Sequence, residues 1–171
     1  AAGCCARILA DLPGLNVRSF LGTINERKHL FTGADIVIDA TGEEAVSEML
    51  SEWRMELRRS GKASPALIHA WLEGQGAAAR SFLNEAPDGA CYRCLEPERG
   101  DPNHRVLRPE AARELVGTCG DLPFTPYGPS APMIAAGLAA QHAADWATGN
   151  REYPLRTMRV DFTNTYDSKP T

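Results

Sequence analysis

The sequence predicts an α/β protein with a mostly parallel sheet, because two strand patterns are separated by one helix pattern. Residues 34–40 form a short β-branched run between Gly33 and Gly42, which is typical of a buried parallel strand. A helix pattern follows at once, and residues 66–72 give the next strand pattern. Strand, helix and strand in this order make a βαβ unit, which favours parallel pairing.

The helix of this unit has a start signal and a core-facing stripe. Thr41 and Glu44 fit a capping box, in which a hydroxyl and a carboxylate satisfy free backbone groups at a helix start. Apolar side chains then recur at helical spacing, namely Val46, Leu50, Trp53 and Leu57. We expect this stripe to pack on the sheet, and Ser60-Gly61 to end the helix.

Further elements are expected on both sides of this unit. Residues 2–12 predict a helix, and residues 15–21 have the mixed polarity of a half-exposed strand. Residues 79–83 predict a strand after a glycine-rich turn, and residues 133–148 predict an apolar helix that is mostly buried. A last strand is indicated by alternating apolar side chains at Met158, Val160 and Phe162.

Bulk composition excludes several classes of protein. The 171 residues are 43% hydrophobic, which suits one globular domain, and the net charge of −4 argues against nucleic-acid binding. No apolar stretch approaches the roughly 20 residues that a membrane span needs. Five cysteines, an odd number, make a disulfide framework a poor interpretation, so a cytoplasmic location is expected. The start lacks both an initiator Met and a signal-peptide pattern, which predicts a fragment or a processed product.

Asp39 is a candidate for nucleotide chemistry. It ends the first parallel strand beside a helix start, where a carboxylate can meet a nucleotide phosphate through Mg²⁺. The alternative is that Asp35 merely begins the strand and Asp39 accepts hydrogen bonds from loop amides. No Gly-x-Gly-x-x-Gly motif follows a strand and opens a helix, so the usual phosphate-binding loop is not found in this chain.

The cysteines suggest two different kinds of site. Cys91 and Cys94 are spaced to bind one Zn²⁺, but structural zinc needs four ligands, and His104 or Cys119 would supply only a third. Cys119 lies before a Pro/Gly-rich run. A catalytic thiol there needs a nearby cation, for which the candidates are Arg105, Arg108 and Arg113. The alternative for Cys119 is a small core residue. We expect both strand His69 and helix His142 to be packed histidines.

Together these segments resemble the E1-like superfamily of ubiquitin-activating enzymes, which includes MoeB and ThiF. The resemblance covers most of the chain, from Ala6 to about Gly149, and its motifs are residues 35–41, 91–97, 119–120 and 132–149. It implies a Rossmann-like α/β sheet. It also implies that residues 1–171 are the C-terminal portion of one adenylation domain, with a crossover and thiol loop at about residues 85–132.

In that family the domain binds ATP and Mg²⁺ and adenylates the C terminus of a ubiquitin-like protein. Many members then transfer the acyl group to a cysteine as a thioester. By resemblance, Cys119 is that acceptor, and the cofactor-binding candidates are Asp39, Thr41 and Glu43. The front part of the family's domain, with its ATP loop, is missing here, so this chain alone is expected to bind ATP poorly.

Two departures from the family pattern refine these expectations. An Asp of the family is replaced by Gly42, so metal contact falls to Asp39, Glu43 or a residue outside the chain. The second Cys-x-x-Cys of the family's zinc site is absent, so whether Zn²⁺ is bound stays an open question. A thiol loop without a full zinc site is more similar to the E1 portion of bacterial E2–E1 fusion proteins in anti-phage CBASS operons.

The resemblance implies several partners: the C-terminal tail of a ubiquitin-like or cGAS-like protein, an E2-like domain, a second copy in a homodimer, and the front part of the same domain. Two alternatives remain. One is a sulfur-carrier adenylyltransferase of the MoeB or ThiF type. The other is a non-catalytic E1-like scaffold that dimerises and holds a partner tail, which the loss of the carboxylate at Gly42 favours.

Overall fold

The computed structural model describes residues 2–74, 76–85, 90–95, 106, 118–119, 122–123 and 127–162. The chain divides into two compact units, Ala1–Gly33 and Ala34–Thr171. Most of the predicted crossover segment, residues 85–132, lies outside the described residues, as do His104 and the three arginines proposed as partners of Cys119.

The first unit is helical. It contains α1 (Ala2–Asp11), α2 (Ile24–Arg27) and the short 3-10 helix η1 (Lys28–Leu30). The predicted first helix is therefore confirmed, but the strand predicted over residues 15–21 is wrong. That segment pairs with no described strand, and its large apolar side chains are exposed, so it has neither the hydrogen bonds nor the packing that stabilise a strand.

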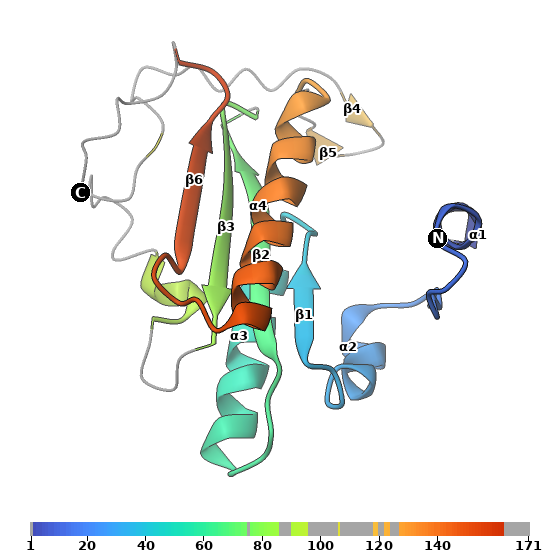
Figure 1. The fold of residues 1–171 in the computed structure, drawn as a ribbon. Helices are drawn as coiled ribbons and strands as arrows, with labels where there is room; N and C mark the ends of the chain where they lie inside the picture. Colours follow the sequence, from blue (N-terminus) through green and yellow to red (C-terminus); the bar gives the residue numbers. More distant parts are fainter. Residues whose placement is uncertain are drawn as a thin grey trace. The chain divides into compact units, whose positions relative to one another are not determined.

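The second unit is built on a four-stranded sheet in the order β1-β2-β3-β6 (Figure 1). Its strands are β1 (Ile36–Asp39), β2 (Ala66–Glu73), β3 (Ala78–Asn84) and β6 (Leu155–Arg159). Strands β1 and β2 are parallel and are connected by α3 (Glu44–Arg59), so the α/β class and the βαβ unit are confirmed. The predicted last strand corresponds to β6, but only Met158 lies within it, whereas Val160 and Phe162 follow it.

The sheet is mixed rather than mostly parallel as predicted, with one parallel pair and two antiparallel pairs. The turn between Glu73 and Ala78 is too short for a parallel crossover, which needs a dozen or more residues. Strand β3 therefore returns antiparallel to β2, and β6 adds antiparallel to β3. A separate two-stranded sheet pairs β4 (Thr118–Cys119) with β5 (Leu122–Pro123).

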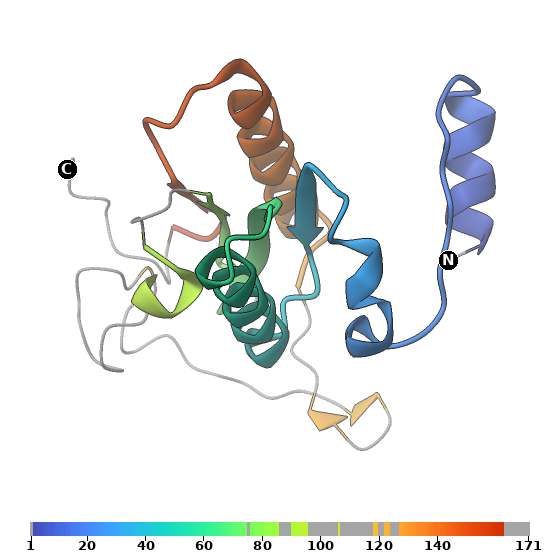
Figure 2. The same cartoon turned by 90° about the horizontal axis from the view of Figure 1, so that it is seen from below.

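Helices cover the two faces of the four-stranded sheet (Figure 2). Helix α4 (Ser130–Thr148) lies on one face, against β2 and β3, while α3 and the 3-10 helix η2 (Tyr92–Leu95) lie on the other. The α4 face is apolar, with a core of Ala66, Ile68, Ala70, Leu83 and Ala139. Small side chains at this interface allow the helix to approach the strands closely.

Helix α4 is less buried than its apolar sequence suggests. Only one stripe is buried, formed by Ala131, Ala135, Ala139 and His142. Met133 is 74% exposed, so the prediction of a mostly buried helix is wrong. One sheet face covers only one side of a helix, and alanine favours helices without needing a core. No helix in the part of the chain that the structure describes is long and apolar enough to span a membrane.

His142 is a packed core histidine, as predicted. Its Nδ1 lies 2.9 Å from Ser81 Oγ on β3, and its Nε2 lies 3.0 Å from the carbonyl oxygen of Tyr153. Burial lowers its pKa, because an imidazolium here would lose its hydration. The side chain thus ties α4 to β3 and to the segment before β6.

Gly76, in the turn between β2 and β3, is predicted to be intolerant of substitution. It has φ +74°, and an added Cβ would lie 2.8 Å from Tyr127 Cβ and 3.0 Å from Ala131 Cβ. We expect Gly76→Ala to lower the free energy of unfolding by about 2–4 kcal/mol, from left-handed strain plus overpacking. Urea unfolding measures this. The matched control is Gly61→Ala, which has a similar φ in open space and should lose only about 1 kcal/mol; equal losses would contradict the steric argument.

Candidate functional site

Asp39 ends β1 with a buried carboxylate that is fully engaged in hydrogen bonds. Its Oδ1 accepts from the Thr41 amide at 3.1 Å and the Thr41 hydroxyl at 2.7 Å. Its Oδ2 accepts from Ser47 Oγ at 2.6 Å and from His69 Nδ1 at 3.0 Å. Burial alone would raise the pKa of Asp39, but the hydrogen bonds from His69, Ser47 and Thr41 outweigh it and hold the pKa at about 2.

Asp39 therefore organises the turn between β1 and α3. The Thr41 hydroxyl, bound to Asp39, also lies 3.3 Å from the amide of Glu43, which is the N-cap residue of α3. The capping box predicted between Thr41 and Glu44 is wrong, because no side chain caps this helix start. Thr41 and Glu43 are exposed residues beside the N-terminus of α3, a position that suits an anion.

Helix α3 turns an unexpected polar stripe toward the sheet. Its buried residues are Ser47, Leu50, Ser51 and Arg54, whereas Val46, Trp53 and Leu57 of the predicted apolar stripe are only partly buried. The helix is thus rotated from the predicted orientation, with Leu50 shared by both stripes. The reason lies in the sheet, which presents Asp39, His69 and Asn84 on this face.

A continuous polar chain runs beneath α3 from Arg54 to Asp39. The Arg54 Nη1 donates to Asn84 Oδ1 at 3.0 Å, and Asn84 Nδ2 donates to Ser51 Oγ at 3.2 Å. Ser51 Oγ lies 3.5 Å from His69 Nε2, and His69 Nδ1 reaches Asp39. The order Asp39, His69, Ser51 is that of a hydrolytic triad, but His69 is fully buried and Ser51 is 2% exposed. No substrate can reach these buried side chains, so this chain of hydrogen bonds is structural.

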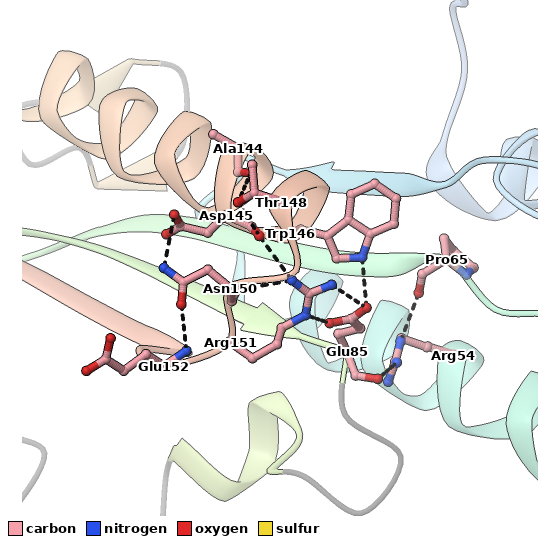
Figure 3. Close-up of polar contacts among 10 residues, drawn as sticks. All are labelled: Arg54, Pro65, Glu85, Ala144, Asp145, Trp146, Thr148, Asn150, Arg151 and Glu152. Carbon is pink, nitrogen blue, oxygen red and sulfur yellow. Dashed lines mark hydrogen bonds and ion pairs between the residues drawn. The ribbon is translucent and has the colours of Figure 1, made fainter.

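At Arg54 the polar chain of hydrogen bonds meets a charged cluster at the end of β3 (Figure 3). Arg54 also donates to the carbonyl oxygens of Pro65, at 2.9 Å, and Glu85. The Glu85 carboxylate accepts from Trp146 Nε1 at 2.9 Å and from Arg151. The residue at the start of the predicted crossover segment is therefore held by α3, α4 and the segment before β6.

The Cys-x-x-Cys motif is docked on the α3 face of the sheet. Tyr92 packs on His69 at 4.7 Å and on Trp71 at 5.7 Å between ring centroids. Arg93 pairs with two carboxylates of α3, Glu48 and Glu52. These contacts place the 3-10 helix η2 over His69 of the polar chain.

Cys91 and Cys94 point toward each other, with their sulfurs 3.4 Å apart. Two thiolates bound to one tetrahedral zinc ion lie roughly 3.8 Å apart, so the two sulfurs would have to separate slightly to bind it. Within the described ranges, however, no group of three or more His, Cys, Asp and Glu side chains gathers to hold a metal. The two thiols thus fit half of a zinc site.

Cys119 lies in β4, where its backbone pairs with Leu122 of β5. The structure brings Asp39, Thr41 and Glu43 together in one turn, and it brings Cys91, just before η2, together with Cys94 of η2. Sequence reasoning missed the buried polar partners on α3 and β3. Their signal was a second stripe at helical spacing in α3, formed by Ser47, Ser51 and Arg54.

The chain is similar to curated proteins named ATP-dependent ubiquitin transferase-like protein Cap2. It is 29% identical to the Pseudomonas aeruginosa protein over 87% of this chain and 26% of that protein. It is 30% identical to the Escherichia coli protein over 66% of this chain and 19% of that protein. It is 32% identical to the Vibrio cholerae protein over 73% of this chain and 24% of that protein. No protein-family model matches the chain.

These matches confirm that the chain is E1-like, as the sequence motifs indicated. They also agree with its likeness to the E1 portion of CBASS fusion proteins. The chain spans about a quarter or less of the length of these curated relatives.

Proposed function

We propose that this chain is the rear portion of an E1-like adenylation domain. In this proposal, the complete domain activates the C terminus of a ubiquitin-like or cGAS-like protein with ATP and passes it to Cys119. The observation that carries the proposal is similarity over 66–87% of the chain to proteins named ATP-dependent ubiquitin transferase-like. Those names favour this function over the sulfur-carrier alternative.

Two steps make up the reaction. A carboxylate oxygen of the tail attacks the α-phosphorus of ATP, which forms an acyl-adenylate and releases pyrophosphate. The thiolate of Cys119 then attacks the acyl carbonyl carbon, which forms a thioester and releases AMP. An E2-like domain would be the next acceptor of the acyl group, and a second copy of the chain a further partner.

The turn after β1 supplies the proposed contacts of this chain to ATP. The oxygens of Asp39 are already occupied by protein donors, so its part is to hold the turn. Thr41 and the exposed carboxylate of Glu43 are the groups that we propose face the nucleotide and its Mg²⁺. Bound Mg²⁺ would neutralise phosphate charge. Cys91 and Cys94 would be two of the ligands if Zn²⁺ is bound.

Loss of the thiol at Cys119 is predicted to abolish transfer while leaving activation intact. The full natural protein is incubated with ATP and a ubiquitin-like or cGAS-like substrate, and adducts are separated with and without dithiothreitol. We expect a dithiothreitol-labile adduct in the wild type and none in Cys119→Ala, because the acceptor sulfur is gone. ATP–pyrophosphate exchange should persist in Cys119→Ala, because adenylation precedes the thiol step.

The matched control is Cys4→Ala, which removes an exposed thiol of α1 and should keep the adduct. An adduct that survives in Cys119→Ala would contradict the acceptor role. Exchange without any adduct in the wild type would favour the sulfur-carrier type, and tail binding with neither exchange nor adduct would favour the scaffold.

A further inference from the structure

The hydrogen bonds of the buried polar chain all run in one direction. The Asp39 carboxylate can only accept hydrogen bonds, so the proton of His69 lies on Nδ1. His69 Nε2 then faces the Ser51 hydroxyl as an acceptor, and Ser51 Oγ in turn accepts from Asn84. Each group thus donates toward Asp39, starting from the Arg54 guanidinium. Such chains strengthen by mutual polarisation.

Histidine is suited to its place in this chain because its two nitrogens serve different partners. Nδ1 lies 3.0 Å from Asp39 Oδ2, while Nε2 lies on the far side of the ring, 3.5 Å from Ser51 Oγ. The first contact is the shorter one and ends on a charged acceptor, so it is the stronger of the two. The Tyr92 ring covers His69, which therefore contacts no ligand.

We propose that His69 is a positioning residue for the nucleotide-facing turn: its Nδ1–H holds Asp39, which in turn holds Thr41 and the start of α3. This inference rests on the proposed function, which assigns the turn to ATP. With Oδ2 fixed by His69 and Ser47, Oδ1 is aimed at both the amide and the hydroxyl of Thr41. Loss of the Nδ1 donor leaves Asp39 Oδ2 with the Ser47 hydroxyl alone, which loosens the carboxylate that holds Thr41.

Two amide substitutions separate the two nitrogens of His69. The side-chain nitrogen of Asn lies near the position of Nδ1, whereas that of Gln lies near the position of Nε2. His69→Asn therefore keeps a donor for Asp39, whereas His69→Gln places its amide group at the Ser51 end and leaves Asp39 without the donor that Nδ1 supplied. A residue that merely fills space would respond to its change in volume, so the smaller Asn would then disturb the turn more than Gln, which is closer to His in size.

The first readout is hydrogen exchange by mass spectrometry on the full natural protein, which does not depend on activity. We expect exchange of the amides of residues 41–47 to accelerate about tenfold or more in His69→Gln and to stay near wild type in His69→Asn, since a hydrogen bond to a charged group is worth about tenfold or more. The matched control is His142→Asn, which alters a buried histidine on the other sheet face. It should leave the exchange of residues 41–47 unchanged.

The second readout is ATP–pyrophosphate exchange. His69→Gln should raise the KM for ATP about tenfold with kcat within about twofold, because the turn is loosened while the thiol and tail are untouched. His69→Asn should restore the KM. Wild-type protein without any exchange activity would contradict the proposed function, and the hydrogen-exchange comparison would still decide whether His69 holds the turn.

Equal effects of the two His69 substitutions on both readouts would overturn the inference, and so would an unchanged turn in His69→Gln. If neither variant folds, the tautomer of His69 in the wild type decides the question. Nitrogen-15 NMR of histidine-labelled protein should show the proton on Nδ1, and a proton found on Nε2 alone would overturn the inference.

Discussion

Replacing Arg54 by Ala is expected to destabilise the sheet unit by about 3–5 kcal/mol, as is typical when one member of a buried charged network is removed. Arg54 is 2% exposed and donates to Asn84 and to the carbonyl oxygens of Pro65 and Glu85. Removal leaves these three acceptors, two of them buried and one partly buried, without their donor. Burial, followed by the nearby charge of Arg58, lowers the pKa of Arg54, because both disfavour the charged guanidinium.

Chemical unfolding of the natural protein and its variants measures the effect. Arg54→Met retains the apolar stem and removes only the guanidinium, so it should lose nearly as much stability as Arg54→Ala. The matched control is Arg59→Ala, at an exposed position of the same helix, with a change within about 0.5 kcal/mol. If Arg54→Met were as stable as the wild type, the side chain would act by packing alone.

Asp39→Ala is expected to cost about 2–4 kcal/mol at neutral pH, because it strands the buried donors of Ser47 and His69. The same change should alter the response to acid. The folded-state pKa of Asp39 is about 2, below its ordinary value of 3.8, so the folded state favours the carboxylate. Its contribution is therefore fully present above about pH 4 and is lost as the pH falls through about 2.

The measurement is urea unfolding at pH 7 and at pH 3. The difference in stability between the wild type and Asp39→Ala should shrink at the lower pH, where the wild type has begun to lose this contribution. The control is Asp35→Ala, at an exposed carboxylate just before the same strand, which should stay within about 0.5 kcal/mol at pH 7. A constant difference between wild type and Asp39→Ala across this range would show that the hydrogen bonds of Asp39 do not depend on its ionisation.

The elements that depend on local pattern were predictable. The β-branched run of β1 and the apolar run of β2 are confirmed as parallel strands around α3. The strand predicted after the glycine-rich turn is also confirmed as β3, but it returns antiparallel, because the turn is too short for a parallel crossover. The failures lie where pattern alone is ambiguous. Residues 15–21 have the polarity of a strand but pair with none of the described strands, and α4 is apolar because of alanines that do not need to be buried.

The sequence alone was enough to recognise the E1-like motifs and the βαβ unit, because these depend on neighbouring residues and fixed spacings. Which face of α3 is buried was decided only in three dimensions. Val46, Trp53 and Leu57 make the more apolar stripe, yet the helix buries serines and an arginine. The reason is that Asp39 and His69 are neighbours across β1 and β2 although 30 residues separate them in the chain, and their buried polar atoms need partners. Hydrogen bonds from α3 to those atoms stabilise the fold more than the extra apolar burial that the other stripe would provide.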